Sequence, residues 1–253
     1  MITLSGVGIH SGKKSTVKIL PQPAGFGIKF SLGDEIFPVD ITLVTGSALA
    51  TTLGKITQVE HLLAAARGMR VTDILVKCES NEIPILDGSS LPYVLAFEKA
   101  GLAGKDKSSP LILKETVRIE EGGKLIVAEP AENFSIEFSV DYPVIGKQSF
   151  YYDGSVESFK KEIAPARTFG YEKDLESLHQ NGLALGASLD NALGIDEKGY
   201  MNPPRFENEP VRHKILDLIG DLALLGRPIN AKIKAYKSSH RLNQLLVRRI
   251  INA

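Results

Sequence analysis

A single cysteine, Cys78, is present in the chain, which excludes an intramolecular disulfide framework. One thiol also cannot build a thiolate zinc site or an iron–sulfur cluster. A metal ion would therefore depend on carboxylates and on imidazoles, of which the sequence has five: His10, His61, His179, His213 and His240. Nothing in this cysteine content points to secretion, and we expect a cytoplasmic protein.

Excess charge of one sign and long apolar runs are lacking as well. Lysine and arginine together number 30, aspartate and glutamate 30, so the formal net charge is zero. Without a basic surface to displace counterions from phosphates, no nucleic-acid partner is expected. No run approaches the ~18–20 apolar residues of a membrane span, and no charged-then-apolar leader is visible, so we expect no integral membrane segment. Glycine-rich nucleotide-binding loops of the common kinds are absent too.

The remaining composition is that of a globular α+β protein. Its 253 residues, 43% of them hydrophobic, suit one large or two ordinary domains. Apolar runs predict strands over 15–20, 27–30, 36–43, 71–78, 111–120, 124–129, 134–140 and 231–236. Helical spacing predicts helices over 57–67, 93–100, 171–180, 211–225 and 240–251. The polar, glycine-containing stretch 101–110 resembles a linker, so we predict similar α+β domains over 1–104 and 105–253.

Helix 211–225 carries the strongest chemical pattern. His213, Asp217 and Asp221 follow at i, i+4 and i+8, away from the apolar stripe, so they share one face. A histidine and an aspartate one turn apart can bind one metal ion from the same side. The alternative is a solvated face that carries ion pairs, because Lys214 lies three residues before Asp217 and could pair with it. A second histidine would favour the metal site.

His61 is the natural second histidine. It stands beside Glu60 early in the helix predicted over 57–67, with Gly68 as a plausible C-cap. Adjacent residues can flank one point, so Glu60 could accept a proton from water at a metal that His61 binds. The alternative is structural: Thr57 and Glu60 fit a capping box, in which Glu60 reaches back to the Thr57 amide.

Other polar residues gain weight only if such a site forms. His240 lies in a polar loop after a strand, where an imidazolium could protonate a leaving amine, although a loop histidine is usually just solvated. Thr168 lies in a loop where threonines mostly cap or turn. We expect His179, in a polar helix, at the surface.

Taken together, these segments resemble the zinc-dependent UDP-3-O-acyl-N-acetylglucosamine deacetylases of lipid A biosynthesis. The matching stretches appear in the family's order and span nearly the whole chain. They are SGVGIHSGKK (5–14), TQVEHLLAA (57–65), NEIPILDGSS (81–90), PARTFGY (165–171), GLALGASLDNAL (182–193), RFENEPVRHKILDLIGDL (205–222) and YKSSHRLN (236–243).

The resemblance implies a fold and a set of roles. The fold is two β-α-α-β sandwich domains whose helical layers pack against each other, with a small insert in each, the second a strand–helix–strand element near 182–195. Matching residue by residue, one Zn²⁺ per chain would be held by His61, His213 and Asp217. Glu60 would be the general base, and His240 the protonated histidine that Asp221 holds charged. Thr168 and Lys214 would stabilise the oxyanion.

The resemblance also implies a UDP-linked acylated amino sugar as the substrate. Asp141 and Tyr142 match positions near its uracil and ribose. Lys124 and Lys237 match basic positions near its diphosphate, although lysines could equally be solvated at the surface. Leu183, Leu185 and Leu189, with Leu193, match an apolar passage for the acyl chain, although leucines at this spacing are more often core. His10 matches a histidine near the site whose role stays open. We expect a monomer that touches a membrane surface only transiently.

Two departures from the family pattern bear on this expectation. The region between Leu43 and Thr57 is short, so the small sheet of the first insert is expected to be reduced. Ser239 stands where the family usually has a glycine before the matching histidine. Two alternatives stay open, an amidase for another acylated amino sugar and a non-enzymatic sugar-nucleotide or partner-binding protein. Iron(II) or cobalt would also suit two histidines and a carboxylate.

Overall fold

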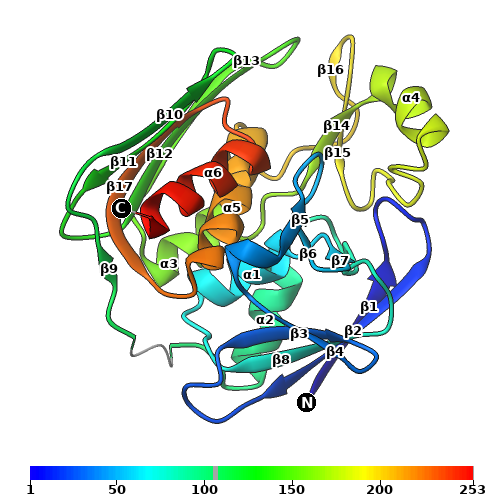
Figure 1. Cartoon of the computed structure of the whole chain (residues 1–253). Helices are drawn as coiled ribbons and strands as arrows, with labels where there is room; N and C mark the ends of the chain where they lie inside the picture. The colour runs from blue at the N-terminus through cyan, green and yellow to red at the C-terminus, as the bar shows by residue number, and fades with distance from the viewer. Residues whose placement is uncertain (105–107, 253) are drawn as a thin grey trace.

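The computed structural model describes residues 1–104 and 108–252 and has a mixed α+β architecture. Its N-terminal unit is a sheet in the order β1-β2-β8-β3-β4, with two helices against one face (Figure 1). The strands are β1 (Ile2–Val7), β2 (Lys14–Pro21), β3 (Ile28–Leu32), β4 (Glu35–Pro38) and β8 (Ile74–Cys78), and the helices are α1 (Glu60–Gly68) and α2 (Leu91–Lys99). Strand β8 pairs antiparallel with β2 and parallel with β3.

The C-terminal unit repeats this design with a sheet in the order β10-β11-β17-β12-β13. Its strands are β9 (Leu111–Ile112), which pairs with one end of β17, β10 (Val117–Glu121), β11 (Lys124–Pro130), β12 (Ser135–Tyr142), β13 (Gly146–Tyr152) and β17 (Ile229–Tyr236). Helices α5 (Glu209–Leu222) and α6 (His240–Ile251) cover one face. Burial alternates along β17, as expected for a strand with one face toward the core.

The helical layers of the two units pack against each other, with α1 beside α5 (Figure 1). Gly220 on α5 allows this close approach, since a Cβ there would lie 2.3 Å from the carbonyl oxygen of Glu60 on α1. A distance under 3 Å leaves no room for a side chain. The first turn of α1 is thereby held against the polar face of α5.

Each unit also carries a small additional sheet. In the first, β5 (Val44–Gly46), β6 (Thr52–Leu53) and β7 (Ile56–Thr57) form short antiparallel pairs, so the insert expected to be reduced does retain a sheet. In the second, β14 (Phe169–Tyr171), β15 (Leu193–Asp196) and β16 (Gly199–Tyr200) accompany α4 (Leu175–Gln180). Helix α4 precedes the expected range 182–195, and residues 182–192 form turns and loops before β15 begins, so that boundary was wrong.

Most predicted elements are confirmed, with their ends adjusted. Helix 57–67 begins at Glu60, because Thr57 lies in β7 and Gln58 has a φ of 66°. Gly68 belongs to the helix, which Met69 follows as C-cap. The run 36–43 divides into β4 and a 3₁₀ turn, and 111–120 into β9 and β10. The apolar runs did not predict strands β1 and β13, nor the short strands of the two additional sheets.

Several short helical segments accompany these elements. They are the 3₁₀ turns Ile41–Leu43, Glu172–Asp174 and Ala223–Leu225, helix α3 (Val156–Ser158) and the π-helical turn Phe159–Ile163. Residues 105–107, in the middle of the predicted linker, lie outside the described residues, and the domain boundary at 104/105 stays a prediction. Over 1–104 and 108–252, no helix combines the length and apolar character needed to cross a membrane.

Candidate metal centre

Three buried donor atoms converge where α1 meets α5. His61 lies on α1, and His213 and Asp217 lie one turn apart on α5; one ligand atom from each lies within 4.8 Å of the others. Oδ1 of Asp217 is 3.3 Å from Nε2 of His213 and 3.8 Å from Nε2 of His61. The imidazole rings stand edge to face, 5.0 Å apart. The polar face of α5 is buried and meets His61, so it is not a solvated face, although the ion pair of Lys214 with Asp217 does form.

Hydrogen bonds occupy one side-chain atom of His213 and one of Asp217, and leave the atom that faces the cluster free to bind a metal ion. Nδ1 of His213 lies 3.1 Å from the carbonyl oxygen of Ala166, which can only accept, so the lone pair is on Nε2. Asp217 accepts Nζ of Lys214 at 2.7 Å on Oδ2, which leaves Oδ1 facing the histidines. Burial would raise the pKa of Asp217, but the neighbouring positive groups, of which the Lys214 ammonium acts most strongly, together outweigh it and lower that pKa well below its usual range.

The cluster fits a divalent cation such as zinc. Burial and the neighbouring His213 lower the pKa of His61 to about 3, so its imidazole is neutral and carries a lone pair. Nδ1 of His61 is buried without a hydrogen-bond partner among the described residues. Two imidazole nitrogens and one carboxylate oxygen are a common catalytic zinc donor set that keeps one position open.

Glu60 is buried directly beside this cluster. Oε2 accepts the backbone N–H of Thr51 at 3.0 Å, and Oε1 accepts Nε2 of Gln58 at 3.0 Å. Burial raises the pKa of Glu60 to about 7, although the charge of His240 acts in the opposite direction. The capping-box alternative is wrong, because α1 begins at Glu60 itself and this carboxylate is bound by other donors.

His240, the first residue of α6, also points its side chain at Glu60 and Asp217. Nδ1 donates to Oδ2 of Asp221 at 2.8 Å, while Nε2 lies 3.8 Å from Oε1 of Glu60 and 3.9 Å from Oδ2 of Asp217. Burial would lower the pKa of His240, but the carboxylates of Asp221 and Asp217 outweigh it and raise that pKa to about 10. The imidazole is therefore held as a cation at neutral pH. The expectation of a merely solvated loop histidine is wrong.

Thr168 lies between Ala166 and Phe169, which both contact His213. Its backbone N–H donates to Gly88 at 2.8 Å. The Phe169 ring is 6.2 Å from the His213 ring and 5.4 Å from the Tyr142 ring. Sequence reasoning missed Phe169, although it directly follows Thr168 in PARTFGY.

Lys214 lies on the same side of the cluster. Its ammonium is 5.7 Å from the centre of the Phe169 ring as well as bonded to Asp217. Burial would lower the pKa of Lys214, but the neighbouring groups, of which the Asp217 carboxylate acts most strongly, together outweigh it and raise that pKa. A permanent positive charge therefore borders the cluster next to the Phe169 ring.

The basic residues predicted for the diphosphate lie around one end of β17. The pairing of Leu125 with Tyr236 places Lys124 beside the step from Tyr236 to Lys237. Nζ of Lys237 is 3.5 Å from Oδ2 of Asp141. Because Tyr142 follows Asp141 and its ring contacts that of Phe169, these residues lead from the ends of the interior strands β17 and β12 toward the metal cluster.

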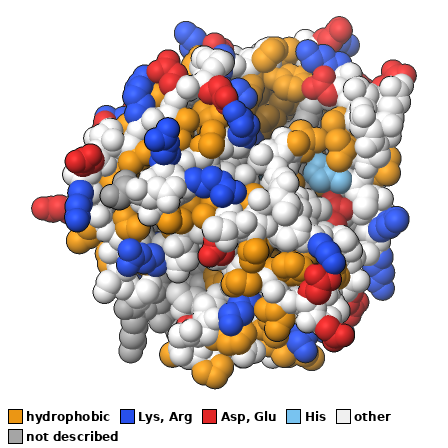
Figure 2. Space-filling view, in the orientation of Figure 1, with side chains coloured by type: hydrophobic (Ala, Val, Ile, Leu, Met, Phe, Trp, Pro, Cys, Tyr) orange, Lys and Arg blue, Asp and Glu red, His pale blue; other side chains and the backbone are white. Residues whose placement is uncertain are grey.

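The leucines predicted for an apolar passage divide into two kinds. Leu185 and Leu189 are 51% and 47% exposed, and Leu183 is half-buried, whereas Leu193 is in the core. The Leu185 segment pairs with the first unit, since its backbone N–H donates to the carbonyl of His10 at 3.0 Å. Figure 2 shows hydrophobic side chains gathered near β14 and β16 on this face. His179 is exposed, as predicted.

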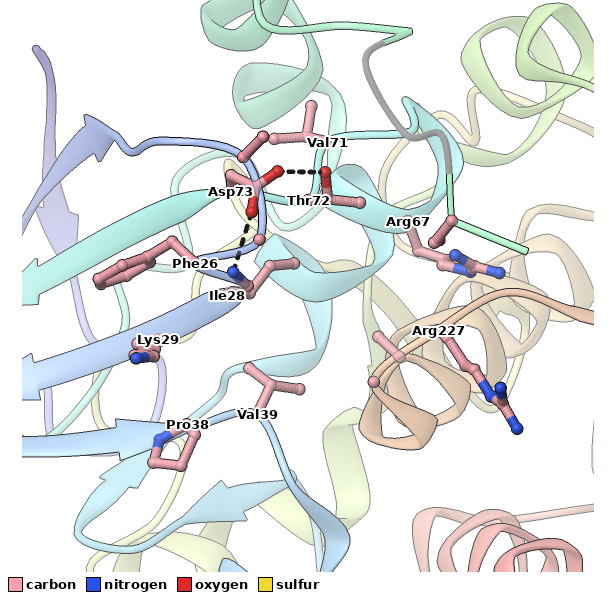
Figure 3. A pocket seen from close by; sticks show the side chains of 16 residues that line it. Phe26, Ile28, Lys29, Pro38, Val39, Arg67, Val71, Thr72, Asp73 and Arg227 are labelled. Carbon is pink, nitrogen blue, oxygen red and sulfur yellow. Dashed lines mark hydrogen bonds between the residues drawn. The ribbon is translucent and has the colours of Figure 1, made fainter. Parts of the chain in front are cut away.

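A separate cavity of about 470 Å³ lies away from the cluster, between the first sheet and the end of the α5 region (Figure 3). Phe26, Ile28, Val39 and Arg227 contribute to its lining. Asp73 closes one wall by accepting the Gly27 N–H at 2.9 Å. None of the donor-cluster residues is among the described residues that line it.

Sequence comparisons agree on one family. Residues 1–252 match the family described as UDP-3-O-acyl N-acetylglycosamine deacetylase (LpxC). The UDP-3-O-acyl-N-acetylglucosamine deacetylase of Myxococcus xanthus is 42% identical over 265 residues, covering 99% of this chain and 84% of that protein. The identically named protein of Oleidesulfovibrio alaskensis is 44% identical, covering 98% and 86%, and that of Synechocystis sp. is 40% identical, covering 98% and 95%.

Proposed function

This chain belongs to the UDP-3-O-acyl-N-acetylglucosamine deacetylase family, and on that premise we propose the reaction that it catalyses. It hydrolyses the 2-acetamido group of UDP-3-O-[(3R)-3-hydroxyacyl]-N-acetylglucosamine, releases acetate, and uses one zinc ion per chain. This step belongs to lipid A biosynthesis. The observation that carries the proposal is the convergence of His61, His213 and Asp217 beside Glu60 and His240.

His61, His213 and Asp217 would hold the metal. When bound there, zinc supplies a Lewis acid that polarises the acetamido carbonyl and makes water more acidic at neutral pH. The chain contributes the orientation of the ligands, through the Ala166 carbonyl behind His213 and the Lys214 ammonium behind Asp217. It also contributes a buried, low-dielectric setting.

Glu60 acts as the general base. Its carboxylate takes a proton from the water whose oxygen bonds to the acetyl carbonyl carbon. A base is most effective when its pKa lies near the working pH, and the burial of Glu60 raises its pKa to about 7. The two donors on Glu60, the Thr51 amide and the Gln58 side chain, fix its orientation.

His240 acts as the general acid. As the bond from carbon to nitrogen breaks, Nε2 of the imidazolium gives its proton to the departing amine and acetate is released. Asp221 holds the ring through Nδ1 and keeps it charged. Lys214 and Thr168 stabilise the negative charge that develops on the carbonyl oxygen, because preorganised donors act strongly where water is excluded.

The two ends of the substrate are assigned to different surfaces. Lys124, Asp141, Tyr142 and Lys237 bind the nucleotide, and Leu183, Leu185 and Leu189 contact the acyl chain. A nucleotide-linked substrate suits a cytoplasmic enzyme, and an acyl chain suits transient contact with a membrane surface. We retain the expectation of a monomer without a nucleic-acid partner.

Acetate release from two substrates tests the assignment. The enzyme should turn over UDP-3-O-(3-hydroxyacyl)-N-acetylglucosamine and discriminate strongly against UDP-N-acetylglucosamine, which lacks the chain. Equal kcat/KM for both would contradict the acyl-chain assignment. Turnover only of some other acylated amino sugar would favour the amidase alternative, and folded, zinc-loaded protein without any activity would favour a binding protein.

A further inference from the structure

Thr51 is a buried polar residue that sequence reasoning did not single out. It lies in the N-terminal unit immediately before β6, and its side chain is completely inaccessible to solvent. Its hydroxyl donates to Oδ1 of Asp221, which lies on α5 of the C-terminal unit. It therefore joins the two units beside the candidate metal centre.

Every polar atom of Thr51 around the site has a defined partner. The hydroxyl accepts Nε2 of Gln244 at 3.1 Å, so its own proton is directed at Asp221. The same oxygen is 3.4 Å from Nδ1 of His240. The backbone N–H donates to Oε2 of Glu60 at 3.0 Å.

Asp221 is the shared acceptor in this arrangement. Oδ2 accepts Nδ1 of His240 and Nδ2 of Asn243, each at 2.8 Å, and both donors come from α6. Among the residues that the structure describes, Oδ1 accepts the hydroxyl of Thr51. The Thr51 hydroxyl therefore fixes the rotation of the carboxylate that orients His240.

We propose that Thr51 is a positioning residue that sets the imidazole of His240 relative to the carboxylate of Glu60. Its amide holds Glu60 within its own unit, while its hydroxyl reaches across to Asp221 and, through Asp221, holds His240. One residue thereby controls the separation of the proposed base and acid. The catalytic consequence rests on the proposed function, whereas the effect on His240 does not.

Thr51→Val isolates the hydroxyl. Valine has nearly the shape of threonine, and the hydrogen bond from the main-chain N–H of residue 51 to the Glu60 carboxylate is retained. Oδ1 of Asp221 would lose its donor and Nε2 of Gln244 its acceptor, and an unsatisfied buried group in such a network costs more than the bond itself contributes. Thr51→Ser keeps the hydroxyl and loses only the methyl group.

The first experiment measures kcat and KM for acetate release, together with zinc content and melting temperature. We expect Thr51→Val to lower kcat by about 10- to 100-fold with KM within about twofold and zinc at one per chain, the loss typical of a hydrogen bond to a charged group. Thr51→Ser should restore most of kcat. Thr52→Val is the matched control, since the Thr52 hydroxyl bonds to Thr57 at 3.1 Å in the small sheet. An unchanged kcat in Thr51→Val would overturn the proposal.

A second background separates positioning from general damage. In His240→Ala protein, Thr51→Val should lower kcat by less than about twofold, because residues acting as one unit are not additive. A further loss as large as in the wild type would show that Thr51 does not act through His240, and the proposal would fail.

A readout without substrate keeps the result independent of the reaction. The low-field proton resonance of the His240 Nδ1–H, identified by its loss in His240→Ala, should shift or vanish in Thr51→Val and stay unchanged in Thr52→Val. If wild-type protein released no acetate, the proposed function would fail while this resonance still tested Thr51. An identical resonance in wild type and Thr51→Val would contradict the positioning role.

Discussion

Glu60 and His240 lie within 3.8 Å of each other, yet their surroundings give them opposite properties. Burial raises the pKa of Glu60 to about 7, so this carboxylate can take up a proton near neutral pH. The carboxylates of Asp221 and Asp217 overcome burial and raise the pKa of His240 to about 10, so this imidazole has a proton to give. Two neighbouring groups whose environments push their pKa values apart are suited to act as the base and the acid of one reaction.

Replacing Glu60 tests the base directly. Glu60→Gln keeps the size of the side chain and removes the proton acceptor, so kcat should fall by about 10²- to 10⁴-fold, the usual contribution of general acid–base catalysis. Zinc should stay at one per chain, because the ligands are other residues. Acetate release and metal analysis of the same sample give both numbers.

Glu79→Gln, on a half-exposed surface ion pair with Lys18, is the matched control and should behave like the wild type. Full activity in Glu60→Gln would show that another group accepts the proton.

Glu209 supports the metal site from a distance. It is completely buried and accepts three bonds from Arg167, at 2.8, 2.9 and 3.1 Å, and one from the Arg205 amide. Arg167 follows Ala166, whose carbonyl holds His213. Loss of the hydrogen bonds that orient a metal ligand typically lowers the affinity for the metal by about 10- to 100-fold.

Glu209→Gln should therefore weaken zinc binding by about that factor. Competition with a chromophoric chelator measures the affinity, and exposed Glu207→Gln is the matched control. Equal affinities for the two variants would show that the Arg167 segment does not position His213.

At the scale of elements, the site depends on α1 and α5 being in contact. A Cβ on Gly220 would lie 2.3 Å from the Glu60 carbonyl oxygen. Gly220→Ala gains about 1 kcal/mol of helix propensity, but the clash must push α1 away from α5. We expect a lower melting temperature and weaker zinc binding, because His61 would move away from His213.

Gly170→Ala is the control for melting temperature, since a Cβ there meets no atom within 4 Å. Thermal unfolding and chelator competition of both variants decide the matter. A Gly220→Ala protein that is more stable than the wild type and binds zinc normally would contradict the packing argument.

The same scale shows what the sequence could predict. Helix α5 was correctly predicted, with His213, Asp217 and Asp221 on one face, because its apolar stripe is strong. Strands β1 and β13 escaped prediction because both are sheet edges with largely half-exposed or exposed side chains, which leaves little apolar contrast. The start of α1 depends on the positive φ of Gln58, which no periodicity reveals.

Candidate site residues were predictable only in part for a related reason. Periodicity places residues on the face of a helix but does not say which helix packs against it. His61 was therefore only a candidate partner for His213 until the resemblance assigned both to one metal site. Thr51 and Glu209 act through bonds between segments distant in sequence, as the contact of Thr51 with Asp221 shows. Such contacts exist only in the folded chain.

For the whole molecule, the candidate centre lies where the two sheet-and-helix units meet. His61 and Glu60 come from one unit, and His213, Asp217 and His240 from the other. Neither unit supplies the full donor set, so binding of a metal ion should also tie the units together. Ligands that bind only the folded form raise its stability by mass action.

Removal and return of zinc test the central claim most directly. Wild-type protein is stripped with a chelator, and acetate release from UDP-3-O-(3-hydroxyacyl)-N-acetylglucosamine is measured as zinc is titrated back, with melting temperature followed alongside. We predict that activity disappears on stripping, returns in step with the first equivalent of zinc, and is accompanied by a rise in melting temperature. Undiminished acetate release by metal-free, folded protein would contradict the account.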